Sequence, residues 1–244
     1  MEPHIYSELA EQEDAHWWFC ARRAIAASLL KRFKLPSNAK ILDAGCGSGG
    51  NLAILAQFGE VCAFEMDDAS CARARSRAIG QVEAGTLPGG IPFAGQAFDL
   101  ITLFDVLEHI EDDAAALDAL ANRLAPEGML LLNVPAFQWL FSRHDILHHH
   151  YRRYGWNDLR QKLEAAGLKI CLMNYWNFWL FPAVATARII ERLCPSRHDA
   201  LGSGTPPIML NKLLTFLASS ERFLIPRLRL PFGTSIVVLA KKRN

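Results

Sequence analysis

The sequence predicts an α/β fold whose mostly parallel sheet is covered by helices on both faces. Short apolar strands alternate with helices from residue 40 to residue 173, and this alternation is typical of parallel strands joined by right-handed crossovers. Three glycines at alternate positions, Gly45, Gly47 and Gly49, follow the first strand at a turn into a helix. With 244 residues, of which 51% are hydrophobic, the chain can build one such core but not two full enzymatic domains.

The elements of this fold can be assigned in order along the chain. Residues 4–34 are expected to be helical, ending before Leu35-Pro36. Strands are expected at 40–44, 61–65, 81–84, 98–104, 129–134, 168–173 and 234–240. Helices are expected between them at 51–58, 68–79, 112–124 and 156–166. The apolar stretch 177–230 is predicted to be a helical insertion before the last strand.

Composition excludes several classes of protein. A net charge of +1 provides no global basic field, so nucleic acid is not an expected partner. The six cysteines form no CxxC pair, which argues against a zinc site and a disulfide framework. The acidic N-terminus lacks the features of a secretory signal, and no stretch reaches the roughly 20 apolar residues of a membrane span. We expect cytoplasmic residence, with peripheral contact at the inner face of the membrane left open.

Two acidic residues flank the glycine run and indicate its ligand. Asp43 precedes the loop, so the pattern Asp-x-Gly-x-Gly-x-Gly differs from the GxGxxG of nicotinamide-dependent enzymes, which binds a pyrophosphate. The Asp43 carboxylate would repel a phosphate but suits the cationic amino-acid end of S-adenosylmethionine (SAM). Glu65 ends the second strand about twenty residues later, where an acid usually accepts both ribose hydroxyls.

The motifs ILDAGCGSG, VCAFEMD and LPGGIPFAGQAFDLITLFDVLEHIED resemble those of class I SAM-dependent methyltransferases over about residues 40–135. The resemblance implies a Rossmann-like fold with a seven-stranded sheet, SAM as cofactor and methyl transfer as activity. It places Met66 on the adenine and the loop at Leu87 beside it, although Gly85-Thr86 stands where many members carry an acid. The implied cofactor-binding residues are Asp43, Gly45, Cys46, Gly47, Glu65, Met66, Leu87 and Phe104.

The segment His16-Trp17-Trp18-Phe19 is similar to an N-terminal signature of these enzymes, in which the leading helix covers the cofactor as a lid. Adjacent tryptophans on a helix cannot both face one core, so Trp17 or Trp18 either contacts the cofactor or the acceptor, or simply packs on the sheet. We therefore divide the chain into an N-terminal helical lid (1–36), a SAM-binding core (37–176), an apolar helical insertion (177–232) and the final core strand (233–244).

Histidines provide the candidates for chemistry. Methyl transfer to a hydroxyl is helped by a base, and His109, His144 and His150 follow the fourth and fifth strands, where an acceptor pocket is expected. His109 could equally cap or pack a loop, and His144 could form an oriented pair with Asp145. The neighbouring cations and aromatics suit a clamp for an anionic or hydroxylated acceptor, or else a solvated loop. These acceptor-binding candidates are Tyr151, Arg152, Arg153 and Tyr154.

We do not expect a metal, but an alternative interpretation of the sequence includes a divalent cation. The spacing of Asp105, Glu108 and His109 is similar to the ExxEH motif of small-RNA 2′-O-methyltransferases and ubiquinone-pathway O-methyltransferases, with Asp105 replacing the first Glu. By this resemblance a divalent cation held by these three residues and His150 would orient and acidify paired hydroxyls.

The apolar insertion 177–232 bears on whether the acceptor is lipid-linked. Its aromatics lie beside arginines, which suits an interface with a membrane or a partner, or packing on the protein's own sheet. The sequence thus predicts methyl transfer from SAM to a small or lipid-linked acceptor, at oxygen. The alternatives are a metal-assisted O-methyltransferase acting on paired hydroxyls, other SAM chemistry on a lipid such as cyclopropanation, and a non-catalytic SAM-binding partner subunit. The oligomeric state is not predicted.

Overall fold

A seven-stranded sheet forms the centre of the molecule, as predicted. The computed structural model describes residues 3–193 and 204–243. The strand order is β3-β2-β1-β4-β5-β7-β6, and β7 runs antiparallel to both of its neighbours while the other pairs are parallel. The strands are β1 (Lys40–Ala44), β2 (Glu60–Glu65), β3 (Gln81–Ala84), β4 (Phe98–Phe104), β5 (Leu124–Pro135), β6 (Leu168–Trp176) and β7 (Ser235–Lys242).

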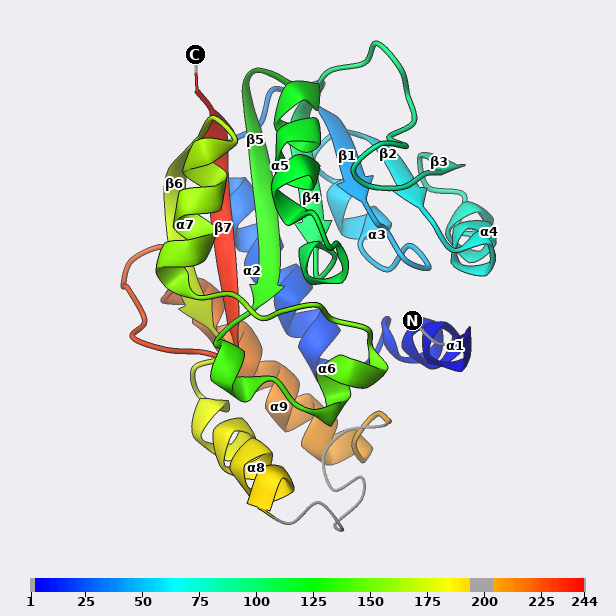
Figure 1. Ribbon diagram of the computed structural model, residues 1–244. Coiled ribbons are helices and arrows are strands. Elements are labelled where there is room, and N and C mark those ends of the chain that lie inside the picture. The colour runs from blue at the N-terminus through cyan, green and yellow to red at the C-terminus, as the bar shows by residue number, and fades with distance from the viewer. Residues whose placement is uncertain (1–2, 194–203, 244) are drawn as a thin grey trace.

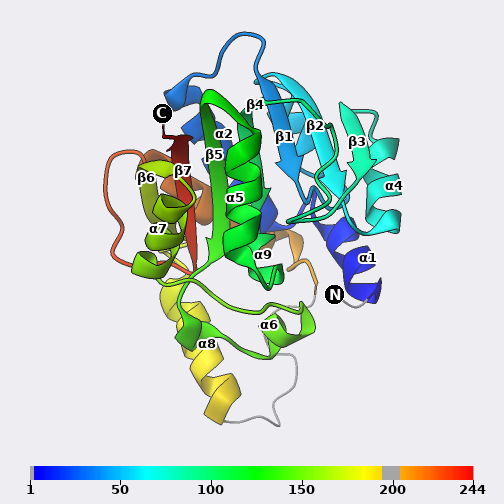
Figure 2. The same ribbon diagram turned by 45° about the horizontal axis from the view of Figure 1, so that its top comes forward.

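Helices cover both faces of this sheet. In Figure 1, α5 and α7 lie in front of the sheet and α2 and α9 lie behind it, and Figure 2 shows the same two layers from above. The helices are α1 (Pro3–Gln12), α2 (Trp17–Phe33), α3 (Leu52–Leu55), α4 (Asp68–Ser76), α5 (Asp113–Arg123), α6 (Arg143–Leu147), α7 (Trp156–Ala165), α8 (Phe181–Leu193) and α9 (Ile208–Ser220). Single 3-10 turns occur at Leu107–His109, Gln138–Leu140 and Glu221–Phe223.

The N-terminal helix is broken, which corrects the expectation of one helix over 4–34. α1 ends at Gln12, and α2 starts at Trp17 after His16, whose Nδ1 accepts a hydrogen bond from the Trp18 backbone at 3.3 Å. A side chain that caps the first turn of a helix terminates any helix running into it. The helix expected at 51–58 is likewise shorter, since α3 covers Leu52–Leu55 only.

The apolar insertion forms α8 and α9, and residues 194–203 between them lie outside the described residues. Asn211 of α9 accepts from the backbone N–H of Trp17 at 2.9 Å, and its amide donates to the carbonyl of Ala15 at 2.8 Å. The insertion is therefore fastened to the start of α2. None of the helices within 3–193 and 204–243 is both long and apolar enough to cross a membrane.

A buried carboxyl group links the turn after α9 to the segment before α8. Glu221 is fully buried, and its Oε1 accepts from the backbone N–H of Trp179 at 3.1 Å. Burial raises the pKa of Glu221 to about 7. A group whose pKa is raised by folding stabilises the protein below its unfolded pKa, and that stabilisation is lost as the pH rises through the folded value.

We therefore expect Glu221 to lower the free energy of unfolding by about 2 to 3 kcal/mol between pH 5 and pH 8. Urea titrations at both pH values check this, with Glu221→Gln expected to lack that part of the decrease. Glu164→Gln on the surface of α7 is the control and should keep the wild-type dependence. An unchanged dependence in Glu221→Gln would contradict the assignment.

Candidate functional site

The glycine loop after β1 forms a cradle at the carboxyl end of the sheet. Gly45, Gly47 and Gly49 have φ values of 71°, 57° and 87°, in the left-handed region that favours glycine. A Cβ on Gly45 would lie 2.7 Å from Val106 Cγ2, so that position is closed by packing. A Cβ on Gly47 would meet nothing within 4 Å. Gly47 is thus the point at which the backbone is open to a ligand.

Asp43 presents a carboxylate oxygen without a partner at the head of this cradle. Its side chain is buried, Oδ1 accepts from Thr102 Oγ1 at 2.7 Å, and Oδ2 has no hydrogen-bond partner among the described residues. Burial raises the pKa of Asp43 to about 6, against the opposing effects of Thr102, Arg22 and Asn51. A buried unpartnered carboxylate oxygen calls for a donor, and a cationic one is the best match.

Glu65 connects the cradle to the end of β2. Its carboxylate accepts from the backbone N–H groups of Gly47, Met66 and Asp67 at 2.9, 2.8 and 2.9 Å. This anchoring of the loop is a role that the sequence analysis missed. Met66 follows with its side chain 67% exposed, an apolar surface beside a buried acid.

Three more predicted cofactor contacts border this region. Cys46 is buried, and burial raises the pKa of its thiol above the usual range, so it is an inert core residue of the loop. Leu87 is half-buried against the core, and Phe104 is buried at the end of β4. Their contacts with a cofactor stay predictions.

The turn between α1 and α2 lies over the cradle. Ser48 of the loop donates to Glu13, and Arg77 Nη2 pairs with the Glu13 carboxylate at 2.6 Å. A Cβ on Gly50 would lie 2.7 Å from the Glu13 carboxyl group, so glycine permits this close approach. The leading segment is therefore held against the loop by charge as well as by packing.

Arg22 fastens α2 to the ends of β4 and β5. Its guanidinium pairs with Asp105, which also accepts from Asn133 Nδ2 at 2.8 and 2.9 Å. The same guanidinium lies 4.9 Å from the ring centroid of Trp18 and 5.2 Å from that of Phe104. Trp18 itself packs 5.6 Å from the ring of Trp176. Among the described residues, this network is the main polar contact between α2 and the sheet.

The histidines cluster beyond β4 and β5. His150 Nδ1 lies 2.8 Å from Asp145 Oδ1, and the His150 and His109 rings are 4.6 Å apart. The ring centroid of His144 lies 4.2 Å from that of His148, and the histidine hydrogen bond to Asp145 comes from His150, where the sequence analysis had considered His144. Burial lowers the pKa of both His109 and His144 to about 3, which keeps them neutral.

Asp145 is the fully buried centre of this cluster. Burial alone would raise its pKa, but hydrogen bonds from His150 and Arg153 hold the pKa below its usual value. Arg153 Nε lies 2.8 Å from Asp145 Oδ1, and the Ser142 backbone N–H donates to Oδ2 at 2.9 Å. The carboxylate therefore stays ionised and fixes the orientation of the His150 ring.

Glu108 carries the second unpartnered carboxylate at this end of the sheet. It is buried, and both of its carboxylate oxygens lack hydrogen-bond partners within the described part of the chain. Ligand atoms of Glu108, His109 and His150 lie within 4.8 Å of one another. Asp105 is not in this group, because it is engaged by Arg22 and Asn133. The metal alternative is thus corrected from four residues to three.

Most residues of the expected acceptor clamp form hydrogen bonds or ion pairs with other residues of the protein. Tyr154 is fully buried and its hydroxyl lies 2.9 Å from Asp113 Oδ2, so its assignment as an acceptor contact is wrong. Arg152 pairs with the same carboxylate at 2.9 Å, and Arg153 with Asp145. Tyr151 is 54% exposed, and its contact with an acceptor stays a prediction.

Comparison with known proteins decides the family. The methyltransferase domain family matches residues 17–172 of this chain. The chain belongs to this family. A Mycolicibacterium smegmatis protein named as a SAM-dependent methyltransferase is 26% identical over 166 residues, which are 66% of this chain and 62% of the relative.

Two further proteins give the range of the similarity. A ubiquinone biosynthesis O-methyltransferase of Parvibaculum lavamentivorans is 28% identical over 137 residues, 53% of this chain and 50% of that protein. A SAM-dependent methyltransferase from Clostridium acetobutylicum superposes with a TM-score of 0.60 at 14% identity, covering 99% of this chain and 97% of that one, which shows the fold alone. The aligned stretches of this chain cover 62% and 50% of the length of the two sequence relatives.

These findings confirm the class I SAM-dependent methyltransferase superfamily, its fold and SAM as the cofactor of the domain. The residues present fit that cofactor, because Asp43 at the end of β1 has a buried oxygen without a partner and the backbone at Gly47, in the loop that follows, is open. The sequence analysis missed Arg22 and Asn133 as parts of the site, and it named Asp145 only as a possible partner of His144 rather than of His150. The position of Arg22 one helical turn after Trp18 was the only signal for Arg22, and Asn133 carried none.

Proposed function

We propose that this chain transfers the methyl group of SAM to an oxygen atom of a small or lipid-linked acceptor. SAM, when bound, supplies a methyl group activated by a positively charged sulfur. Asp43 would hold its ammonium group, Glu65 its ribose and Met66 its adenine, with the open backbone at Gly47 alongside. The remaining side chains then need to align the acceptor, exclude water and take up its proton.

The contact between His150 and Asp145 is the observation that favours oxygen as the methylated atom. A hydroxyl acceptor must lose its proton as it is methylated, and a positioned imidazole can take it. The ionised carboxylate of Asp145, 2.8 Å from Nδ1, favours the tautomer with hydrogen on that nitrogen. Nε2 is then free to accept a proton. His109, neutral and 4.6 Å away between ring centroids, walls this position and would stay uncharged during the reaction.

Exposed apolar side chains support an acceptor with a lipid part. Ile146 and Leu147 of α6 are exposed within the segment that carries the histidines, as are Ile189 and Ile190 of α8. In Figure 1 both helices lie at the end of the sheet toward which the arrows of β4 and β5 point. These side chains give an apolar acceptor a surface to contact beside the histidine cluster.

Transfer of labelled methyl from SAM into a cell extract, split into aqueous and lipid phases, tests this proposal. We expect label in one phase, released with S-adenosylhomocysteine, and mass spectrometry should locate the methyl on oxygen. A bridging methylene in the product would instead indicate cyclopropanation. Binding of SAM with no label in either phase would contradict transfer and favour a non-catalytic partner subunit.

A metal-assisted reaction is the second candidate, favoured by the orphan oxygens of Glu108. Glu108, His109 and His150 offer one carboxylate and two imidazoles, a donor set that suits Zn²⁺, and Asp145 would orient His150 from behind. A cation there would polarise the acceptor hydroxyl, and His150 would then be a ligand rather than a base.

We expect, on this second candidate, one equivalent of Zn²⁺ per chain by elemental analysis after loading and dialysis. Glu108→Gln keeps the size of the side chain but cannot supply a carboxylate ligand, so it should reduce the bound metal to a trace. Glu164→Gln, on the surface of α7, should bind as the wild type does. Metal-free protein whose transfer activity survives a chelator would rule this candidate out.

A further inference from the structure

Apolar side chains gather on the outer surface of α9 and the turn that follows it. Met209 is 81% exposed and Phe216 71% exposed, and three further large apolar residues nearby are also open to solvent. We call these five residues the α9 face: Ile208, Met209, Leu213, Phe216 and Phe223. Single exposed apolar residues are common on proteins, but a contiguous group of this size usually marks an interaction surface.

The exposed charges within the stretch that carries the α9 face are of one sign. Between residues 204 and 233 the only acidic residue is Glu221, and its side chain is fully buried. The basic residues of the same stretch are Lys212, Arg222, Arg227 and Arg229. Lys212 and Arg222 border the groove beside the α9 face, whereas Arg229 packs 4.3 Å from the ring centroid of Trp156 on α7 and does not belong to this surface. A partner that matches this surface is therefore apolar inside and anionic at its boundary.

A shallow groove of about 720 Å³ runs beside the α9 face, between α9 and the start of α2. Its walls are largely apolar, with Ile208, Phe216 and Phe223 on one side and Ala15 and Cys20 on the other. Lys212 and Arg222 also border it. A groove of this volume can accept an acyl chain while cations contact the headgroup.

The α9 face is continuous with the covering of the active site. Asn211 lies within α9 and is hydrogen-bonded to Ala15 and Trp17, at the point where α2 begins. One and a half turns further along α2, Arg22 reaches Asp105 at the end of β4. Anything that contacts the first half of α9 thus lies next to the segment that covers the site.

We infer that the α9 face docks on an anionic lipid surface, with its apolar side chains in the interface and its cations at the headgroups. An amphipathic helix with a basic border binds membranes in this way. The inference rests on the proposed function only in making the acceptor lipid-linked. Docking itself requires no catalysis, so the two can fail separately.

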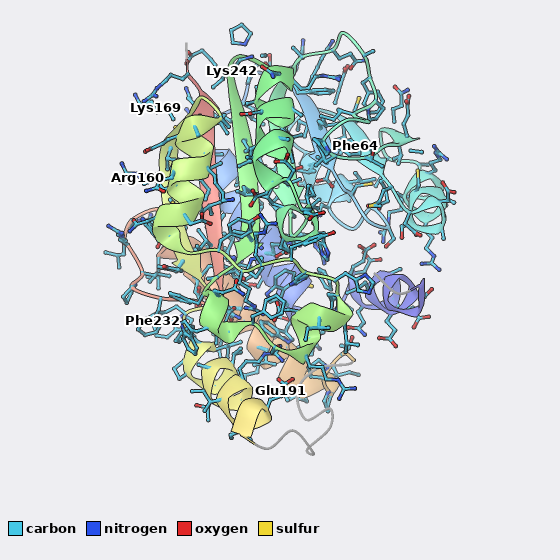
Figure 3. The ribbon with its side chains drawn as sticks, viewed as in Figure 1. Phe64, Arg160, Lys169, Glu191, Phe232 and Lys242 are labelled. Carbon is cyan, nitrogen blue, oxygen red and sulfur yellow. The ribbon has the colours of Figure 1, made fainter. Side chains whose placement is uncertain are left out.

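Co-sedimentation of the full chain with vesicles tests this inference. We expect binding to phosphatidylcholine vesicles that contain phosphatidylglycerol, little binding to phosphatidylcholine alone, and weakening by salt. Lys212→Glu should lower the partition coefficient about tenfold or more. Lys169→Glu is the matched control, because Lys169 lies on β6 at the end of the molecule opposite α8, as Figure 3 shows, and it should bind as the wild type does.

A second pair of variants separates apolar contact from charge. Phe216→Ser should weaken vesicle binding severalfold, and Phe216→Leu, which keeps an apolar side chain, should retain most of it. Folded wild-type chain that stays in the supernatant with anionic vesicles would overturn the inference. So would equal binding by all four variants, or a dimer in sedimentation velocity that Phe216→Ser dissociates without any vesicle binding, since the occupant would then be a second copy. SAM affinity, measured in parallel, reports on the proposed function independently.

Discussion

Replacing His150 by asparagine is expected to lower kcat for methyl transfer to a hydroxyl by about 10² to 10⁴-fold. The asparagine amide can still donate to Asp145 from near the position of Nδ1, so the buried carboxylate keeps a partner. Only the Nε2 side of the ring is lost. The reason for the loss in rate is therefore the missing proton acceptor, and single-turnover kinetics with the acceptor identified by labelling measures it.

His148→Asn serves as the matched control for this variant. His148 lies in the same cluster, with its ring centroid 5.9 Å from that of His150, but the hydrogen bond to Asp145 is made by His150. We expect its kcat to stay within a few-fold of the wild type. SAM affinity should be unchanged in both variants. If His150→Asn retained full activity, the acceptor would need no base at this position.

Replacing Asp43 by asparagine is expected to weaken SAM binding about 10- to 100-fold, since it removes a charge-assisted hydrogen bond to the ammonium group. Equilibrium binding at pH 8 measures the effect, with Asp67→Asn as the control. Asp67 also lies near Glu65, but its carboxylate caps α4 by accepting from the Ser70 N–H at 2.8 Å. An unchanged affinity in Asp43→Asn would mean that this carboxylate does not contact the cofactor.

Asp43→Asn should also change how the free energy of unfolding depends on pH. Because burial raises the pKa of Asp43 to about 6, its ionisation destabilises the fold above that pH. The wild type should lose about 1 to 2 kcal/mol of unfolding free energy relative to Asp43→Asn between pH 5 and pH 8. The SAM affinity of the wild type should instead fall as the pH drops below 6, because the Asp43 carboxylate is then protonated. Parallel curves for both proteins would contradict the assignment.

The cofactor end of the site could be predicted from sequence because its residues are local. Asp43, Gly45 and Gly47 lie within five positions, and Glu65 ends the next strand, which is a parallel neighbour of the first. Because adjacent strands of a parallel sheet run in the same direction, their carboxyl ends lie side by side. The fold class follows from the same alternation of strands and helices.

The acceptor end could not be predicted in the same way, because its contacts join distant segments. Arg22 and Asp105 are 83 residues apart, and nothing in either neighbourhood indicates that they pair. Tyr154 was expected at the surface of a basic loop, but its hydroxyl fits between Leu107 and Asp113, 47 and 41 residues away. Within the histidine run, spacing alone could not decide whether His144 or His150 meets Asp145, since the α6 turn and the loop after it determine that.

Calorimetric titration of the wild type with SAM tests the central claim most directly, namely that the ends of β1 and β2 form a SAM site. The account predicts one SAM per chain, weaker binding by Asp43→Asn and wild-type binding by His150→Asn. Absence of binding by the folded wild type, or equal binding by Asp43→Asn, would contradict it.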